Sequence, residues 1–375
     1  MDDTESHTFR LWKKSAPEHQ VQRVRRHNLP STSRIIKYIL LSILLLLTLG
    51  IYKKHAIFNK TNISSPDAHP KHANNTPEQP ARSSSTPSND TTIYPKFGKC
   101  TASFGGPSLP YDTAIASHDL HNTLHAYPHY ILHEQMLRGL WSKHSYLLTV
   151  LGQELSKPEP QRLKWLLWHD RDTVLMNPQI PLDIFVPPED KGFGHINLLV
   201  TKDRNGLNNG VFMVRVGQWA VKMLASVLSI REYRPDVVLK YTEQSGMEEV
   251  IKRPWWNSSV AYIPQRWFNG FPPNADVEHD NAISHSRPGS LLIHFASNRD
   301  GLRPQRMAQW GEVARKRVSE WDKPVEETYY LEEIAEYWER VGRNESFDSI
   351  NRGIGRRFWH VPKVVRGADE VSGRA

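Results

Sequence analysis

Two aspartates separated by one residue follow an apolar run. The segment "LKWLLW" (163–168) predicts a buried strand, and Asp170 and Asp172 come just after it. In extended backbone, side chains at this spacing face the same way, and two like charges so placed repel unless a cation lies between them. Carboxylate oxygens suit Mn²⁺ or Mg²⁺. The pattern favours a divalent-metal site, and the alternatives are a solvated turn or helix capping by Asp172.

The Asp-x-Asp spacing alone is weak support, because about one such triplet is expected by chance in a chain of this length. Its position at the end of a buried strand is what favours the metal site.

A second polar segment, residues 203–210, runs directly into an apolar stretch at 211–216. Gly206 and Gly210 permit positive φ and close approach of a ligand to the backbone. The Asn pair at 208–209 offers amide donors and acceptors for hydroxyl groups of a ligand. The alternative interpretation is a plain hairpin turn.

His294 lies inside a third apolar run, residues 291–296. A histidine in a strand is either a metal ligand or a core residue with its hydrogen bonds satisfied. Arg299 and Arg303 follow closely and could meet phosphate charge.

Glu243 and Gln244 open a predicted helix. A carboxylate there benefits from the helix dipole, so helix capping explains this pair as well as a binding role does.

The globular part alternates short apolar runs with amphipathic stretches, and it contains no repeat of fixed period. This alternation predicts an α/β domain with a mainly parallel sheet, in which ligands bind at the carboxyl ends of the strands. The predicted strands are 163–168, 196–200, 211–216, 260–264 and 291–296, and the predicted helices are 219–230 and 302–321.

The first hundred residues have a different composition, rich in Pro, Ser, Thr, Asn and His. Residues 35–52 are apolar enough for a membrane helix of about 27 Å, which suits a thin bilayer of the early or middle secretory pathway. A cleaved signal peptide is the alternative, but the run starts far from Met1 and no small-residue cleavage site follows. We therefore expect a cytosolic tail (1–34), an anchor (35–52) and a disordered stem (53–95), followed by a catalytic domain (96–321) and a C-terminal helical extension and tail (322–375).

Basic residues are denser before the apolar run than after it, which predicts a cytosolic N-terminus and a lumenal domain. Much of the net charge of +8 lies in this flank, so no nucleic-acid surface is required. The lone Cys100 excludes an intramolecular disulfide. Glycosylation triplets begin at Asn59, Asn62, Asn74, Asn89, Asn257 and Asn344, and four of them fall in the stem.

Taken in order, the motifs resemble glycosyltransferase family 34, the fungal and plant α-galactosyl-, α-mannosyl- and α-xylosyltransferases with a GT-A fold. The resemblance runs from about Tyr111 to Trp310. Its markers are "SHDLH" (117–121), "LWSK" (140–143), the Asp-x-Asp strand end, "GLNNGVF" (206–212), "EQS" (243–245), "IPQRWFN" (263–269) and "HF" (294–295). The resemblance implies a GT-A-like single catalytic domain. The type II architecture expected from the apolar run and its basic flank agrees with it independently, and we expect the protein in the Golgi membrane.

The resemblance also implies roles for individual residues. Asp170, Asp172 and His294 would hold Mn²⁺, with Mg²⁺ as the alternative ion. The donor-binding residues would be Lys143, Asp203, Gly206, Asn208, Gly210 and Arg299, with Arg299 on the phosphates. Gln244 would lie near the anomeric carbon, with Glu243 beside it. Two departures from the family pattern are Arg171 between the aspartates and Glu243 where an Asp is usual.

The implied reaction is transfer of a hexose, galactose or mannose, from UDP-galactose or GDP-mannose to a glycan acceptor on protein or lipid, with retention of configuration. Other Golgi glycosyltransferases are candidate partners. Because Gln244 is a poor nucleophile, we expect a same-face reaction through a short-lived ion pair rather than a covalent intermediate. The alternatives are a membrane-anchored, inactive lectin-like or complex subunit and a metal-dependent hydrolase. The hydrolase is disfavoured because no second metal cluster is evident in the sequence.

Overall fold

The computed structural model describes residues 94–273, 283–296 and 298–357. The predicted tail, anchor and almost all of the predicted stem lie outside these ranges. No helix among the described residues is long and apolar enough to cross a membrane.

A six-stranded sheet forms the centre of the domain, with strand order β2-β1-β3-β6-β5-β7. β6 is antiparallel to both of its neighbours, β3 and β5, whereas the other pairings in this sheet are parallel. The expected α/β class with a mainly parallel sheet is therefore confirmed. The strands of this sheet are β1 (Phe97–Ala102), β2 (His129–Leu132), β3 (Trp165–His169), β5 (Leu198–Asp203), β6 (Gly206–Arg215) and β7 (Val260–Tyr262).

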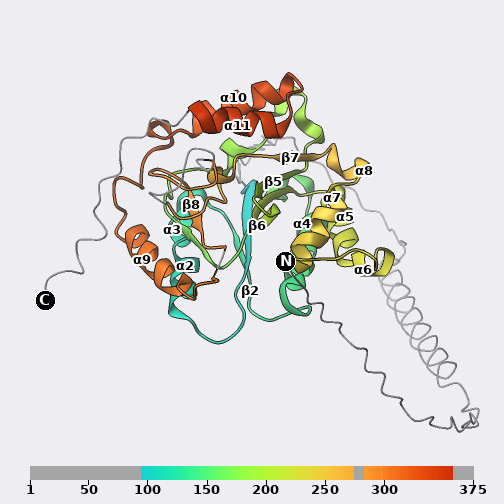
Figure 1. Cartoon of the computed structure of the whole chain (residues 1–375), viewed down its shortest axis with the longest axis horizontal. Coiled ribbons are helices and arrows are strands. Elements are labelled where there is room, and N and C mark those ends of the chain that lie inside the picture. The colour runs from blue at the N-terminus through green and yellow to red at the C-terminus, as the bar shows by residue number, and fades with distance from the viewer. Residues whose placement is uncertain (1–93, 274–282, 297, 358–375) are drawn as a thin grey trace, which may run out of the picture. The chain divides into compact units, whose positions relative to one another are not determined.

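Helices cover one face of the sheet, on the side of α4, α5 and α7 in Figure 1. Alternate strand residues point to this face, among them Leu166 and Trp168 of β3, and they pack on Leu147 of α4 and Met223 of α5. The helices that belong to this side of the sheet are α4 (Ser142–Ser156), α5 (Gln218–Leu228), α6 (Ile230–Tyr233), α7 (Thr242–Ile251) and α8 (Pro254–Asn257).

The opposite face of the sheet packs on the C-terminal helices α10 (Tyr330–Gly342) and α11 (Phe347–Arg357). Trp165 and Leu167 of β3 share one buried cluster with Trp267 and with Tyr330 of α10. In its described part, residues 322–357, the segment expected to be a C-terminal helical extension thus contains α10 and α11, and their buried side chains belong to the core of the sheet.

A two-stranded antiparallel sheet lies beside the main one and pairs β4 (Thr173–Leu175) with β8 (Leu292–His294). Its apolar residues pack on α2 (Leu109–Ala116) and α9 (Arg303–Arg315), which lie next to each other in Figure 1. The short helix α3 (Asp119–His125) follows α2. This small sheet brings the segment after β3 against the segment that contains His294.

Some sequence-based boundaries were wrong. The polar segment 203–210 forms the hairpin that was the alternative interpretation, because β5 and β6 pair tightly at Asp203 and Gly206 and residues 206–210 already belong to β6. The helix predicted over 302–321 ends at Arg315. β1 was not predicted, since its sequence "FGKCTA" lacks a clear apolar pattern. Its Lys99 is nevertheless buried, with Nζ 3.3 Å from Nδ1 of His118.

Candidate functional site

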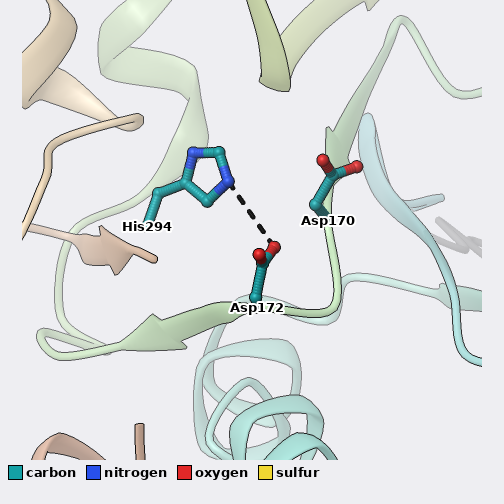
Figure 2. Close-up of side chains that lie close together, drawn as sticks. All are labelled: Asp170, Asp172 and His294. Carbon is teal, nitrogen blue, oxygen red and sulfur yellow. Dashed lines mark ion pairs between the residues drawn. The ribbon is translucent and has the colours of Figure 1, made fainter. Parts of the chain in front are cut away.

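Asp170, Asp172 and His294 meet at one point between the two sheets. One ligand atom of each lies within 4.8 Å of the others. Figure 2 shows the carboxylate of Asp172 facing the imidazole of His294, with the Asp170 carboxylate beside them. Asp170 directly follows β3, Asp172 precedes β4, and His294 ends β8 opposite Thr173. The predicted combination of these three residues is therefore present in the fold.

Backbone hydrogen bonds fix the segment that carries the two aspartates. The Asp170 N–H donates to the carbonyl of Gly210 at 2.7 Å, and the Phe295 N–H donates to the carbonyl of Asp172 at 2.9 Å. A Cβ atom at Gly210 would overlap the imidazole of His294. Glycine is thus required at this position because the ring of His294 fills the space above it.

The orientation of His294 follows from a buried amide. Nδ1 of His294 lies 2.6 Å from Oδ1 of Asn269, while Nδ2 of Asn269 donates to acceptors that include Oγ1 of Thr201 and the carbonyl of Val211. Since the amide nitrogen is already engaged with acceptors, its oxygen must accept from Nδ1–H of His294. Nε2 of His294 then faces Oδ1 of Asp172 at 3.5 Å and is the ring nitrogen available to a metal.

Each aspartate also has a basic partner. Nζ of Lys143, in α4, lies 2.9 Å from Oδ1 of Asp170, and Nη1 of Arg303, in α9, lies 2.9 Å from Oδ2 of Asp172. Burial, together with the charge of Asp172, raises the pKa of Asp170 against the attraction of Lys143. Burial also acts to raise the pKa of Asp172, but the adjacent imidazole of His294 and the charge of Arg303 outweigh it and lower that pKa. The two carboxylates therefore differ in their electrostatic surroundings.

Lys143 connects the metal-ligand candidates to the predicted catalytic pair. Its buried ammonium donates to the carbonyl of Asn209 at 3.0 Å and lies 3.6 Å from Oε1 of Glu243. Burial alone would lower the pKa of Lys143, but the charges of Asp170 and Glu243 raise it above its usual value. Gln244 lies next in α7, and its Oε1 accepts the Asn209 N–H at 3.2 Å. Lys143, Glu243 and Gln244 thus belong to one polar network around Asn209.

The other predicted donor-binding residues of this region shape the β5–β6 hairpin. Oδ2 of Asp203 accepts from Nδ2 of Asn208 at 3.0 Å, and Oδ1 of Asn208 accepts the Gly210 N–H at 3.0 Å. Gly206 has a φ of +103°, and a Cβ there would approach Oε1 of Glu248 at 2.6 Å. Asp203, Asn208 and Gly206 therefore have clear roles in the hairpin itself, and Asn208 and Gly210 connect it to the triad.

Three arginines near the site differ in their contacts with the two aspartates. The structure describes no ion pair between the exposed Arg299 and either carboxylate, whereas Arg303, at the start of α9, reaches Asp172. Arg171, between the aspartates, points away from them: its Nη1 donates to the carbonyl of Phe104 at 2.9 Å. Its guanidinium lies 4.2 Å from the ring centroid of Tyr111.

Sequence reasoning assigned no role to two groups that contact the triad. Nε1 of Trp168 donates to Oδ1 of Asp170 at 2.8 Å, and Asn269 holds His294. Asn269 ends the "IPQRWFN" segment, so its position in a recognised motif was the available signal. Trp168 was assigned to the core, since its indole is buried and only its N–H reaches the site.

Comparison with known proteins bears on this site directly. The family model for the galactosyl transferase GMA12/MNN10 family matches residues 118–300, a stretch that contains Asp170, Asp172 and His294. Over these residues the chain matches this family. Its resemblance to glycosyltransferase family 34, inferred above from seven motifs, is thereby confirmed.

Proteins from two yeasts are similar to this chain in sequence. A probable alpha-1,6-mannosyltransferase, MNN10 of Saccharomyces cerevisiae, is 27% identical over 31% of this chain and 36% of its own length. An alpha-1,2-galactosyltransferase of Schizosaccharomyces pombe is 23% identical over 45% of this chain and 51% of its own length. The chain spans about half or less of the length of each of these two relatives.

Two solved structures are similar to the chain at low identity. One is a glycosyltransferase involved in the glycosylation of the major capsid of PBCV-1, with 16% identity, a TM-score of 0.43 and coverage of 57% of this chain and 100% of its own. The other is the galactosyltransferase LgtC in complex with donor and acceptor sugar analogs, with 13% identity, a TM-score of 0.38 and coverage of 59% and 100%.

Proposed function

We propose that this protein is a Mn²⁺-dependent retaining glycosyltransferase that moves galactose or mannose from a nucleotide-sugar donor to a glycan acceptor. The observation that carries the proposal is the convergence of Asp170, Asp172 and His294, within the segment that the family model matches. The named activities of the yeast relatives, mannosyl and galactosyl transfer, support the choice of sugar.

The three side chains fit a divalent cation by their chemistry. Two carboxylates and one imidazole nitrogen are ligands that Mn²⁺ accepts, and Mg²⁺ is the alternative ion. His294 has its second ring nitrogen fixed by Asn269, as is usual for metal-bound histidines. A bound cation would stabilise the negative charge that develops on a departing nucleoside diphosphate, without a proton donor.

Lys143 and Arg303 are placed to bind the phosphates of the donor. Each is now paired with one aspartate, so a cation that neutralises the carboxylates frees these two basic groups for a new anion. Arginine binds phosphate oxygens in a bidentate manner, and lysine acts as a point charge. Arg303 thus joins Arg299, to which the family resemblance assigns the same role.

The donor sugar would lie beside α7, where Gln244 accepts the Asn209 N–H and Glu243 lies close to Lys143. Gln244 is a neutral amide, so it can orient and stabilise the anomeric centre but is a poor nucleophile. Glu243 is buried against Lys143, which suits it to position sugar hydroxyls rather than attack. A same-face transfer follows, in which the leaving phosphate takes the proton of the acceptor hydroxyl.

The place of the protein in the cell is part of the proposal. The apolar run at 35–52 and its basic flank support a single-pass type II protein of the Golgi membrane with a lumenal catalytic domain. Protease added to sealed vesicles should then remove an N-terminal tag only, and an endoglycosidase should shift the mobility of the full-length protein. Protection of the N-terminal tag would refute this topology.

The direct test of function is transfer itself. The full-length protein would be incubated with UDP-galactose, GDP-mannose or UDP-xylose and an acceptor glycan, with and without Mn²⁺. We expect nucleoside diphosphate release and a hexose mass gain on the acceptor, both dependent on Mn²⁺. Glycan binding without turnover on any donor would instead indicate the lectin-like or complex subunit.

A further inference from the structure

Two tyrosines at the start of helix α10, Tyr329 just before it and Tyr330 as its first residue, contact the two segments that lead to Asn269 and His294. The hydroxyl of Tyr330 donates to the carbonyl of Trp267 at 2.7 Å and accepts the Leu291 N–H at 2.8 Å. Tyr330 is fully buried. One hydroxyl therefore joins two backbone segments that are far apart in the sequence.

Both segments continue directly to the site. Asn269, which holds His294, is two residues after Trp267, and His294 itself is three residues after Leu291, about 10 Å along an extended chain. The two segments meet again at the site, where the His294 N–H donates to the carbonyl of Gly270 at 2.7 Å. The Tyr330 hydroxyl thus holds the two segments together at one end, and the contacts of Asn269 and His294 hold them together at the other.

The neighbouring tyrosine makes a parallel connection. The hydroxyl of Tyr329 lies 2.8 Å from Oγ of Ser290 and donates to the carbonyl of Arg266 at 3.3 Å. It therefore links the residues that precede Leu291 and Trp267. Two consecutive hydroxyls hold the same pair of segments together.

Buried charge holds α10 in place over these segments. Glu333, one turn after Tyr330, accepts from Nη2 of Arg266 at 2.6 Å and from Nε1 of Trp267 at 3.0 Å, and it is fully buried. Charge-assisted bonds in a buried setting resist displacement, because removing one partner leaves the other charge unpaired. The tyrosine hydroxyls are therefore held rigidly against the segments that carry Asn269 and His294.

We propose that Tyr330, with Tyr329, is a positioning residue for the metal site, so that a helix beyond the family match at 118–300 completes the site. The inference rests on the proposed function, since it concerns the cation bound by Asp170, Asp172 and His294. Loss of the Tyr330 hydroxyl leaves the buried carbonyl of Trp267 and the buried N–H of Leu291 without this partner. The two segments are then held together less tightly, and the position of His294 is less well fixed.

The test compares Tyr330→Phe with Tyr337→Phe. Tyr337 is a fully buried residue of the same helix, and its hydroxyl donates to the carbonyl of Tyr262 at 3.1 Å rather than to Trp267 or Leu291. Both variants lose one buried hydroxyl and keep the ring. Mn²⁺ alone would be titrated into each full-length protein, with free Mn²⁺ measured by electron paramagnetic resonance and the melting temperature measured in parallel.

We expect both variants to melt at lower temperature, but only Tyr330→Phe to bind Mn²⁺ about tenfold more weakly, the usual size of an effect on groups that orient metal ligands. Equal Mn²⁺ affinity in Tyr330→Phe and Tyr337→Phe would overturn the inference while the metal site stands. Absence of Mn²⁺ binding by the unaltered protein would overturn the metal site itself, and this inference with it. If Tyr330→Phe does not fold, Tyr329→Phe gives the same comparison at Ser290 and Arg266.

Discussion

The imidazole of His294 and the amide of Asn269 form a buried hydrogen bond of 2.6 Å, which directs the other ring nitrogen of His294 toward Asp172. The same amide nitrogen donates to Oγ1 of Thr201 and to the carbonyl of Val211, so Asn269 is itself fixed. The ligand direction of His294 is therefore set by a residue that would not touch the cation.

Asn269→Ala should weaken Mn²⁺ binding by about tenfold to a hundredfold, because the histidine loses the partner that orients its ring. Mn²⁺ titration and melting temperature would be measured together. Asn177→Ala is a matched control, since Asn177 is also fully buried and its Nδ2 donates to the carbonyls of Gly289 and Lys323. Unchanged Mn²⁺ affinity in Asn269→Ala, with a loss of stability like that of the control, would contradict the orienting role.

Asp170→Asn and Asp172→Asn should each lower transferase activity at least tenfold at limiting Mn²⁺, because each removes one unit of ligand charge while keeping the shape. The fold should persist, since each change also relieves the repulsion between the two carboxylates. Activity as a function of Mn²⁺ concentration, with the melting temperature, decides the matter. Full activity of both variants at limiting Mn²⁺ would show that the cation binds elsewhere.

Arg303→Ala should change two affinities in opposite directions. The variant should bind Mn²⁺ alone more tightly, because Asp172 loses a competing cation 2.9 Å away. It should bind the nucleoside diphosphate about tenfold or more weakly at saturating Mn²⁺, as expected for loss of a charged hydrogen bond. Arg306→Ala, in the same helix but paired with the exposed Asp300, should change neither. A fall in both affinities for Arg303→Ala would argue against the proposal that Arg303 leaves Asp172 to bind phosphate when the cation is bound.

A cluster of buried histidines should make the fold sensitive to acid. Nε2 of His129 lies 3.0 Å from Nε2 of His169, and the rings of His169 and His118 stack at 3.9 Å. Burial and the nearby Lys99 lower the pKa of His129 from 6.5 to about 4, and burial lowers the pKa of the other two well below 6.5. The unfolded chain therefore binds more protons between about pH 6.5 and 4, and the free energy of unfolding falls as the pH falls through this window.

Urea unfolding at pH 7.5, 6 and 5 would measure this effect. His129→Gln should reduce the dependence of the unfolding free energy on pH, because one proton taken up on unfolding is removed. His195→Gln, at an exposed position, should leave that dependence unchanged. An equal dependence of the unfolding free energy on pH in His129→Gln and in the unaltered protein would refute the claim that His129 takes up a proton on unfolding.

The sequence by itself determined the local chemistry of this protein. The apolar run before Asp170, the Asp-x-Asp spacing and the apolar setting of His294 are local patterns, and they correctly predicted strands β3 and β8 and the residues at their ends. The order of the seven motifs identified the family for the same reason, since motif order is a property of the chain alone. The mainly parallel sheet followed from the alternation of strands and helices.

Only the tertiary structure decided which groups surround these residues. Lys143 and Arg303 reach the two aspartates from α4 and α9, and no spacing in the sequence relates those helices to β3. Tyr330 acts from beyond the matched segment, through hydrogen bonds to backbone groups, which leave no pattern in the types of the residues they join. Local periodicity reports which face of an element is buried, whereas the partner across a buried contact is set by packing between elements distant in the chain.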